Sequence, residues 1–400
     1  MNETRPSPCA LCGSRNVIML IDEPGHPLAQ NALFDDQSKA VLADRCSLTV
    51  IQCTACGHVA NVAPGWSDAG FAQDYNSDQS WSPRFSSHVD DILIRVSRNA
   101  PAGAHVCEIG CGQGYFLSRL SALKPDEALT FTGFDPAFNG PQAVDNINIH
   151  RCAFDAESSR LLPRKADIVI VRQVLEYISD PVGFLKSIAR VLSPKGSLFI
   201  EARDADWSWK AAAIEDMSSE LRAYFSAATL EFALRKAGFG KVETERLFDE
   251  QFLWARASSP ESGPSIAPGL PDPRNACAML GRFVSVRQAK AAAVRAFLHD
   301  RQRHGGVALW GAGTKGISLS SLVDAGAKVL RAIIDVSPAR HGKFTAGDGL
   351  PIVDPRSAAD MGVRTVVVVN AAYMTEIRQM ASSANLPFEL YSLDELTSSV

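Results

Sequence analysis

The sequence lacks three features that would assign it to a membrane, to secretion or to nucleic acid. No apolar run approaches the roughly 20 residues that a membrane-spanning helix needs. The first residues, Met1 to Pro6, contain no apolar core of the kind that a signal peptide carries. The net charge is −4, with 40 Lys and Arg against 44 Asp and Glu, so the chain offers no bulk positive field to a polyanion. We therefore expect a cytoplasmic protein with neither a membrane nor a nucleic-acid partner.

A disulfide framework is also missing. The nine cysteines are odd in number and unevenly spread, which favours thiols and metal ligands in a reducing compartment. Four of them form two C-x-x-C pairs, and two thiolates at this spacing converge on one point. The predicted ligands of a structural zinc ion are Cys9, Cys12, Cys53 and Cys56. The alternatives are a redox role for the pairs, or Cys46 or His58 as a substitute ligand.

Three glycines at alternate positions form the motif around which the neighbouring patterns are arranged. Gly110, Gly112 and Gly114 separate a β-prone run, 105–109, from an amphipathic run, 115–123. This order predicts a strand, a tight turn and a helix, with positive φ at the glycines and bare main chain against which a ligand can lie. The free N–H groups of the helix start would face that ligand.

Acidic residues complete the glycine pattern. Glu108 precedes the glycines and gives the E-x-G-x-G-x-G form found in class I S-adenosylmethionine (SAM) methyltransferases, whose spacing differs from the dinucleotide G-x-G-x-x-G. Asp135 follows the next predicted strand, 129–134, and would emerge at the same sheet edge, where a carboxylate can accept both hydroxyls of a ribose. The alternative is a glycine turn that binds nothing.

The residues that follow support the SAM interpretation. A buried-type strand (166–171), an acidic Leu-Glu turn, a helix (181–192), a Ser-Pro-Lys-Gly turn and a strand (198–200) come in the order that a methyltransferase sheet requires. Phe154 and Asp155 follow a predicted strand and either hold the adenine ring or begin a loop. The further cofactor-binding candidates are Tyr115, Pro136, Arg172 and Gln173.

Two other segments of the middle region have readable patterns. The connector from Trp66 to Arg98, which includes Tyr75 and Asp78, is either a lid over a pocket or a helix with Trp81 and Phe85 in the core at i, i+4 spacing. Further on, we predict a helix at 227–237 with Ser226 as its N-cap, and then a hairpin at 241–257.

The βα pattern restarts near the C-terminus. A linker rich in serine, proline and glycine leads into a long helix, 276–304. Gly311, Gly313 and Gly316 then form a full G-x-G-x-x-G, and Asp335 follows the next strand. By itself this pattern is a dinucleotide fingerprint. The rival interpretation is a Rossmann-shaped domain whose glycine turn faces a substrate or another domain and holds no NAD.

Taken in order, four features resemble the sugar C-methyltransferase family, whose best-known members methylate a TDP-linked 4-keto sugar. They are the four-cysteine module, the SAM domain, the Tyr-Phe-Ser stretch at 224–226 and the C-terminal G-A-G-x-K-G. The segments 25–33, 342–344 and 349–352 extend the match to nearly the whole chain. The resemblance implies a three-domain enzyme with zinc as a fold element, SAM in the middle domain, and the acceptor between the middle and C-terminal domains.

The expected fold class is α/β, with a Rossmann-like SAM methyltransferase domain between a small zinc module and a second Rossmann-like domain. The predicted boundaries are 1–75 for the zinc-binding module, 76–257 for the methyltransferase domain, 258–275 for the linker and 276–400 for the C-terminal domain.

The chain departs from the family where the chemistry is carried. In the family's L-E-H-I pattern, this chain has Tyr177 in place of the histidine. In the family's E-H-x-x-Y-F-S pattern, Glu220 is kept and Leu221 stands in place of the histidine. Both histidines are absent. Methylation of a carbon beside a ketone needs a base to form the enolate. The catalytic candidates are Glu220, Tyr224, Tyr177 and His88. Otherwise the acceptor is a more nucleophilic atom that needs little beyond positioning.

The expected function is SAM-dependent methylation of a small molecule, such as a nucleotide-linked keto sugar or an intermediate of secondary metabolism. The alternatives are O- or N-methylation on the same scaffold, and a silent partner protein that binds SAM or a nucleotide. We expect Glu220 at the acceptor pocket with a raised pKa, against the simpler possibility of a solvated glutamate at a helix start.

Overall fold

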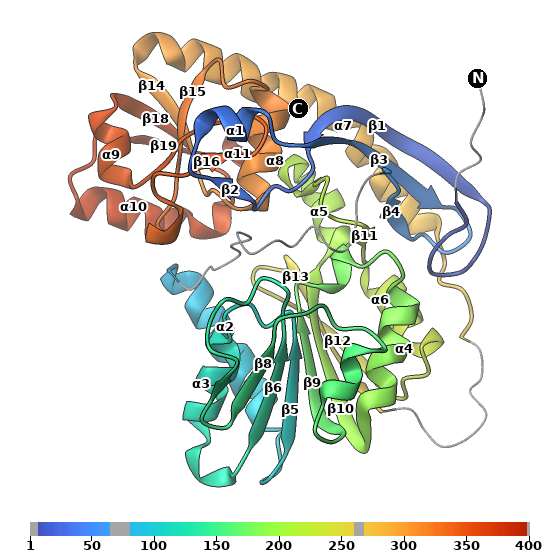
Figure 1. Cartoon of the computed structure of the whole chain (residues 1–400). Coiled ribbons are helices and arrows are strands. Elements are labelled where there is room, and N and C mark those ends of the chain that lie inside the picture. Colours follow the sequence, from blue (N-terminus) through green and yellow to red (C-terminus); the bar gives the residue numbers. More distant parts are fainter. Residues whose placement is uncertain (1–6, 65–80, 260–267, 398–400) are drawn as a thin grey trace.

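The computed structural model describes residues 7–64, 81–259 and 268–397. Figure 1 shows the largest sheet at the bottom, the C-terminal sheet at the upper left and the N-terminal strands at the upper right. The predicted α/β class is confirmed. No helix in the described ranges is both long and apolar enough to cross a bilayer.

The middle sheet has eight strands in the order β12-β13-β10-β9-β5-β6-β8-β7. Its parallel strands are β5 (His105–Ile109), β6 (Thr130–Phe134), β8 (Ile147–His150), β9 (Ala166–Arg172) and β10 (Leu192–Arg203). The antiparallel edges are β7 (Ala143–Val144), β12 (Val242–Leu247) and β13 (Phe252–Ser258). The parallel strands have near-continuous apolar sequences because helices cover both faces of the sheet.

The side chains of β9 show how these helices are divided between the faces. Ile168 and Ile170 pack with α2 (Pro83–Ser97) and α3 (Tyr115–Leu123). Val169 and Val171 pack with α4 (Pro181–Val191) and α6 (Ala227–Lys236). Successive residues of a strand point to opposite faces, so a four-residue apolar run builds both layers. From the end of β10, α5 (Ala205–Ala211) carries the chain toward the C-terminal sheet (Figure 1).

The connector before the middle sheet is helical where the structure describes it. Ser82 caps α2, and Phe85 is buried as expected. The placement of Trp81 in the core was wrong: this residue precedes the cap and is 50% exposed. A residue before the N-cap is not on the helical spiral, so the i, i+4 spacing does not apply to it. Tyr75 and Asp78 of the suggested lid lie outside the described residues.

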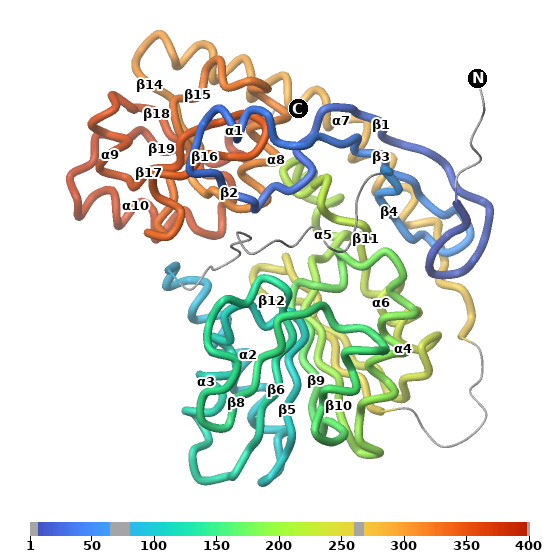
Figure 2. The backbone as a smooth tube through the Cα atoms, in the orientation of Figure 1, coloured from blue at the N-terminus to red at the C-terminus, as the bar shows by residue number. Residues whose placement is uncertain are grey.

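The N-terminal sheet takes a strand from the middle of the chain. Its order is β1 (Val17–Pro27), β3 (Arg45–Cys53), β4 (Val59–Asn61) and β11 (Ala223–Tyr224). A separate two-stranded sheet pairs β2 (Leu33–Phe34) with β16 (Phe344–Thr345), and α1 (Gln37–Val41) follows β2. Figure 2 shows the blue N-terminal chain crossing to the C-terminal sheet. The N-terminal segment therefore shares strands with both of the other parts.

The C-terminal sheet is parallel throughout, in the order β17 (Ile352–Val353), β15 (Leu330–Ile334), β14 (Gly306–Trp310), β18 (Val363–Val368) and β19 (Glu389–Ser392). Its helices are α7 (Arg274–Arg301), α8 (Thr314–Val323), α9 (Pro355–Asp360), α10 (Met374–Ser383) and α11 (Leu393–Thr397). One apolar cluster joins Leu48 of β3, Trp209 of α5, Phe283 of α7 and Leu309 of β14. The three parts therefore pack against one another through shared core residues.

Candidate cofactor and acceptor site

The three glycines between β5 and α3 have φ values of 75°, 54° and 80°, which confirms the predicted left-handed turn. Their roles differ. A Cβ on Gly110 would lie 2.2 Å from Val174 Cγ2, and one on Gly114 would lie 2.6 Å from Ile149 Cδ1. A Cβ on Gly112 would meet nothing within 4 Å. The outer glycines thus allow close packing, and the middle one leaves space in which a ligand can approach the main chain.

Asp135 lies beside this turn, as predicted. Its Oδ2 accepts a hydrogen bond from Gly112 N at 2.7 Å, and its Oδ1 accepts one from Ala137 N at 2.8 Å. Burial raises the pKa of this carboxyl against the effect of the two backbone donors. Each oxygen keeps a second lone pair, so the carboxylate can still receive a ligand's hydroxyl groups.

The surroundings of the Glu108 carboxyl group indicate whether a cofactor fits beside the glycine turn. The residue is 2% exposed, and its Oε2 has no hydrogen-bond partner among the described residues. Burial raises its pKa to about 8. A buried carboxyl oxygen without a partner is unusual in a folded chain. Its place two residues before Gly110 fits a ligand with a cationic group, and SAM carries both an ammonium and a sulfonium.

The remaining cofactor candidates differ in their surroundings. Tyr115 is 45% exposed and Pro136 is half-buried. Phe154 is buried edge-on against Phe134, with ring centroids 5.3 Å apart. Asp155 is exposed and accepts hydrogen bonds from the backbone N–H groups of Glu157 and Ser158, which lower its pKa. The contacts of Asp155 are thus those of a loop start.

Arg172 and Gln173 converge on a residue that the sequence interpretation missed. Glu201 lies in register with Arg172 on the adjacent strand and is fully buried. Its Oε1 accepts from Gln173 Nε2 at 3.0 Å and lies 3.7 Å from Arg172 Nη2. Its Oε2 lies 2.8 Å from His88 Nε2. The available signal was an acidic residue at the carboxyl end of an apolar strand, next to the strand of Arg172.

Glu220 is fully buried, so it is not a solvated glutamate. Its Oε1 accepts from the backbone N–H groups of Gln30 and Asn31, the latter at 3.0 Å, in the loop between β1 and β2. Burial raises the pKa of Glu220 to about 7, in the direction expected. Glu220 therefore joins the N-terminal loop to the middle domain.

The other catalytic candidates fall into two groups. Tyr224 is buried and its hydroxyl lies 3.2 Å from both Ser218 N and Ser218 O, and burial raises its pKa, which disfavours a phenolate. Tyr177 is buried in the same apolar cluster. His88 lies elsewhere, in an aromatic cluster with Phe248 and Phe252 at centroid distances of 5.1 and 5.6 Å.

The C-terminal glycine turn repeats the first one. Asp335 Oδ2 accepts from Ala312 N at 2.8 Å and its Oδ1 accepts from Ser337 N at 2.9 Å, as Asp135 does with its own turn. The start of α8 is nevertheless bound to other parts of the chain. Thr314 Oγ1 accepts from Asn31 Nδ2 at 2.6 Å.

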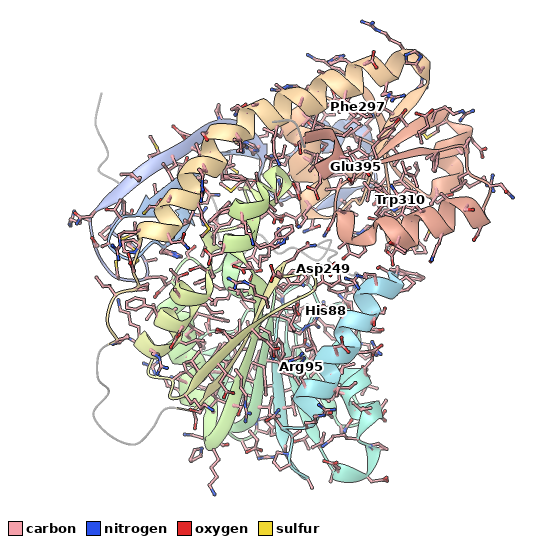
Figure 3. All side chains as sticks on the ribbon, turned by 180° about the vertical axis from the view of Figure 1, so that it is seen from behind. His88, Arg95, Asp249, Phe297, Trp310 and Glu395 are labelled. Atoms are coloured by element: carbon pink, nitrogen blue, oxygen red, sulfur yellow. The ribbon has the colours of Figure 1, made fainter. Side chains whose placement is uncertain are left out.

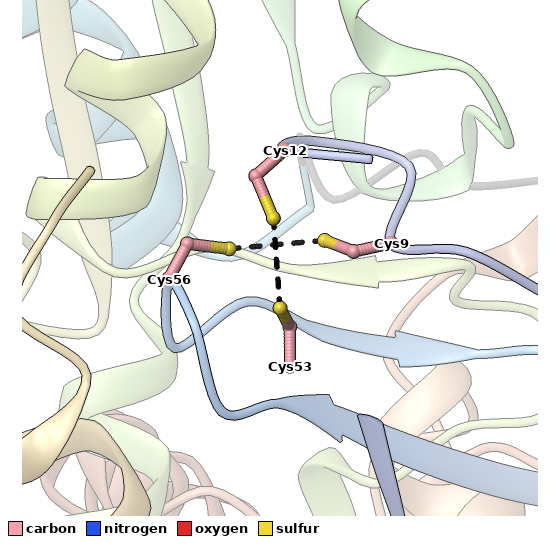
Figure 4. Close-up of side chains that lie close together, drawn as sticks. All are labelled: Cys9, Cys12, Cys53 and Cys56. Carbon is pink, nitrogen blue, oxygen red and sulfur yellow. Dashed lines mark hydrogen bonds between the residues drawn. The ribbon is translucent and has the colours of Figure 1, made fainter. Parts of the chain in front are cut away.

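The four predicted zinc ligands come together. Their sulfur atoms all lie within 4.8 Å of one another, with 3.7 Å between Cys9 and Cys56 and 3.6 Å between Cys12 and Cys53 (Figure 4). A tetrahedral zinc site with bonds of about 2.3 Å has sulfur–sulfur edges of about 3.8 Å. The cluster is therefore compatible with zinc. Within the described ranges, neither Cys46 nor His58 is part of this cluster.

Comparison with known families agrees with this geometry. Residues 81–244 match the model of a methyltransferase domain, and residues 276–385 match the model of a C-methyltransferase C-terminal domain. The two matches together support the expectation of a SAM-dependent methyltransferase, with the methyltransferase domain in the middle of the chain.

Among curated proteins, the chain is 24% identical to the C-methyltransferase NovU of Streptomyces niveus over 381 residues, covering 88% of this chain and 86% of that protein. It is 27% identical over 134 residues to the tRNA U34 carboxymethyltransferase of Trichodesmium erythraeum, covering 32% of this chain and only 38% of that protein. A solved O-methyltransferase family protein of Burkholderia thailandensis gives 16% identity and a TM-score of 0.36, with 48% of this chain and 60% of that chain covered.

Proposed function

We propose that this chain transfers the methyl group of SAM to a carbon atom of a small-molecule acceptor. The observation that carries the proposal is the order of the two matched domains: a methyltransferase domain with an open glycine turn precedes a C-methyltransferase C-terminal domain. The similarity to a C-methyltransferase over most of both chains supports the same target atom.

The residues of the glycine turn would hold the cofactor. Asp135 would bind the ribose hydroxyls, Gly112 would lie against the ligand, and Glu108 would face its cationic part. Bound there, SAM supplies an electrophilic methyl group. The four cysteines would hold a structural zinc ion that fixes the two C-x-x-C turns against the middle domain, where Leu11 O already accepts from Lys236 Nζ of α6.

The acceptor would bind between the middle and C-terminal parts. The carboxyl ends of β5, β9 and β10 face the C-terminal sheet (Figure 1). Polar side chains link the two parts there. Gln251, the last residue of the turn between β12 and β13, accepts from Lys315 Nζ at 3.2 Å and from Asn370 Nδ2 at 2.9 Å. A nucleotide-linked keto sugar is the acceptor class that the family resemblance favours.

Turnover of SAM to S-adenosylhomocysteine tests the proposal. The purified chain is incubated with SAM and, separately, with a TDP-linked 4-keto-6-deoxy sugar, a phenol or an amine, and the product is analysed by mass and carbon NMR. We expect a new carbon–carbon bond on the keto sugar. A methyl group on oxygen or nitrogen would instead show a heteroatom methyltransferase. SAM binding without turnover of any of these acceptors would contradict C-methylation of this acceptor class.

A further inference from the structure

Carbon methylation beside a ketone needs a proton acceptor within reach of the methyl donor. Adjacent parallel strands lie about 4.8 Å apart, so residues in register across three strands form a short row. Glu201 of β10 is paired with Arg172 of β9, and the preceding residue, Val171, is paired with Ile109 of β5. The row therefore ends beside Gly110, which puts Glu201 only two strands from the glycine turn.

His88 is bound to this row through its side chain. Its Nε2 lies 2.8 Å from Glu201 Oε2, and this is the hydrogen bond that the imidazole makes in the described part of the chain. The imidazole is 7% exposed and is held by the rings of Phe248 and Phe252. Figure 3 shows His88 nearer than Arg95 to the end of α2 that faces the C-terminal part.

The charge of Glu201 decides which nitrogen of His88 carries the proton. Burial disfavours the carboxylate, but Arg172, His88 and Gln173 outweigh this effect and lower the pKa of Glu201. An ionised carboxylate only accepts hydrogen bonds. His88 Nε2 must then be the donor, so when the ring carries a single proton the nitrogen with the free lone pair is Nδ1.

We infer that Glu201 is a positioning residue that fixes the proton of His88 on Nε2 and so makes Nδ1 the base for the acceptor carbon. This inference rests on the proposed function. His88 would take the role of base that the family resemblance gives to the absent histidines. The acceptor C–H bond breaks, its proton moves to Nδ1, and its electron pair stays on carbon as the enolate. The enolate carbon then bonds to the methyl carbon as the sulfur–methyl bond breaks with its electron pair left on sulfur. The imidazolium finally releases its proton to solvent.

The proton step can be measured apart from methyl transfer. A TDP-linked 4-keto-6-deoxy sugar is incubated with the chain in D₂O without SAM, and deuterium entry beside the ketone is followed by proton NMR. We expect His88→Gln and Glu201→Gln each to slow the exchange about a hundredfold. The matched controls are His299→Gln, which changes an exposed residue, and Glu231→Gln, which changes a side chain that is 45% exposed; both should exchange at the unmodified rate.

The outcomes separate the two proposals. If the unmodified chain binds SAM but neither exchanges nor methylates the probe, the proposed function fails. If it does both, and Glu220→Gln abolishes exchange while His88→Gln does not, the inference alone is overturned. Nitrogen-15 NMR of His88 in the unmodified chain gives a check that needs no acceptor and no stable variant. We expect the proton on Nε2, and a proton on Nδ1 would overturn the inference.

Discussion

Lys315 Nζ lies 2.9 Å from Asp216 Oδ1, so the lysine of the C-terminal glycine turn forms an ion pair with the middle domain. Burial disfavours the charge of Asp216, but Lys315 and Arg203 outweigh it and lower its pKa. Removing one partner of a buried pair costs about 3–5 kcal/mol because the other charge is left behind. We expect Lys315→Met to lower the urea midpoint clearly. The double variant with Asp216→Asn should recover part of the loss, and an additive result would contradict a direct interaction.

The C-terminal glycine turn should not bind a dinucleotide. Thr314 and Lys315, at the helix start where a pyrophosphate would sit, are already bound to Asn31 and Asp216. Isothermal titration with NAD and with NADP should show no heat of binding beyond dilution. Micromolar affinity for either would show that these contacts open and that the G-x-G-x-x-G is a working dinucleotide site.

The two equivalent aspartates offer a matched pair of variants. Asp135→Ala should weaken SAM binding roughly a hundredfold or more, because charge-assisted hydrogen bonds are worth about 1.5–3 kcal/mol each. Asp335→Ala removes the same kind of backbone contacts from the C-terminal turn and should leave SAM affinity unchanged. Calorimetry decides between the sites: equal losses in both variants would point to general unfolding, and no loss in Asp135→Ala would place the cofactor elsewhere.

The cysteine cluster should carry one zinc ion per chain when the protein is purified without chelator. Cys53→Ser removes one of four thiolates and should abolish zinc binding and lower the melting temperature. Its effect on SAM affinity should be small, because the glycine turn belongs to another sheet. Cys46→Ser changes a cysteine outside the cluster and should keep the metal. Elemental analysis measures the content, and an unmodified chain without zinc would refute the assignment.

Burial of Glu220 should make stability depend on pH. Its pKa is raised from 4.5 to about 7, so the folded chain holds a proton that the unfolded chain releases. The contribution of this bound proton to the free energy of unfolding is therefore fully present below about pH 4.5. It is lost as the pH rises to about 7, and the loss is up to about 3 kcal/mol. Glu220→Gln cannot ionise and should lose less stability between pH 5 and 8. Glu231→Gln changes a side chain that is 45% exposed and should follow the unmodified profile in thermal melts. A parallel profile for both variants would contradict the assignment.

Local patterns predicted the middle sheet well. The strand at 105–109 and the helix at 115–123 have the predicted bounds, because apolar runs and glycines are properties of the neighbouring sequence. The Ser226 cap is also confirmed, with Thr229 completing its capping box. Convergence of the four cysteines followed from thiolate spacing alone.

Contacts between distant segments were not predictable. β11 is two residues long, and its pairing with β4 leaves no periodic signal. The hydrogen bonds of Glu220 to Gln30 and Asn31 depend on where a loop is placed by packing, as does the approach of His88 to Glu201. Sequence patterns report which groups can titrate, whereas the partners of those groups are fixed by the tertiary arrangement.

The pairing of β2 with β16 has a consequence for biosynthesis. Gln37, just beyond β2, donates to Gly349 O across 312 positions of sequence. At roughly 5–20 residues per second, translation of that stretch takes about 16–60 s. During this time the nascent segment around β2 has no strand to join, and its unpaired edge is open to chaperones or to neighbouring chains. Docking of this segment is therefore expected to be among the last steps of folding on the ribosome.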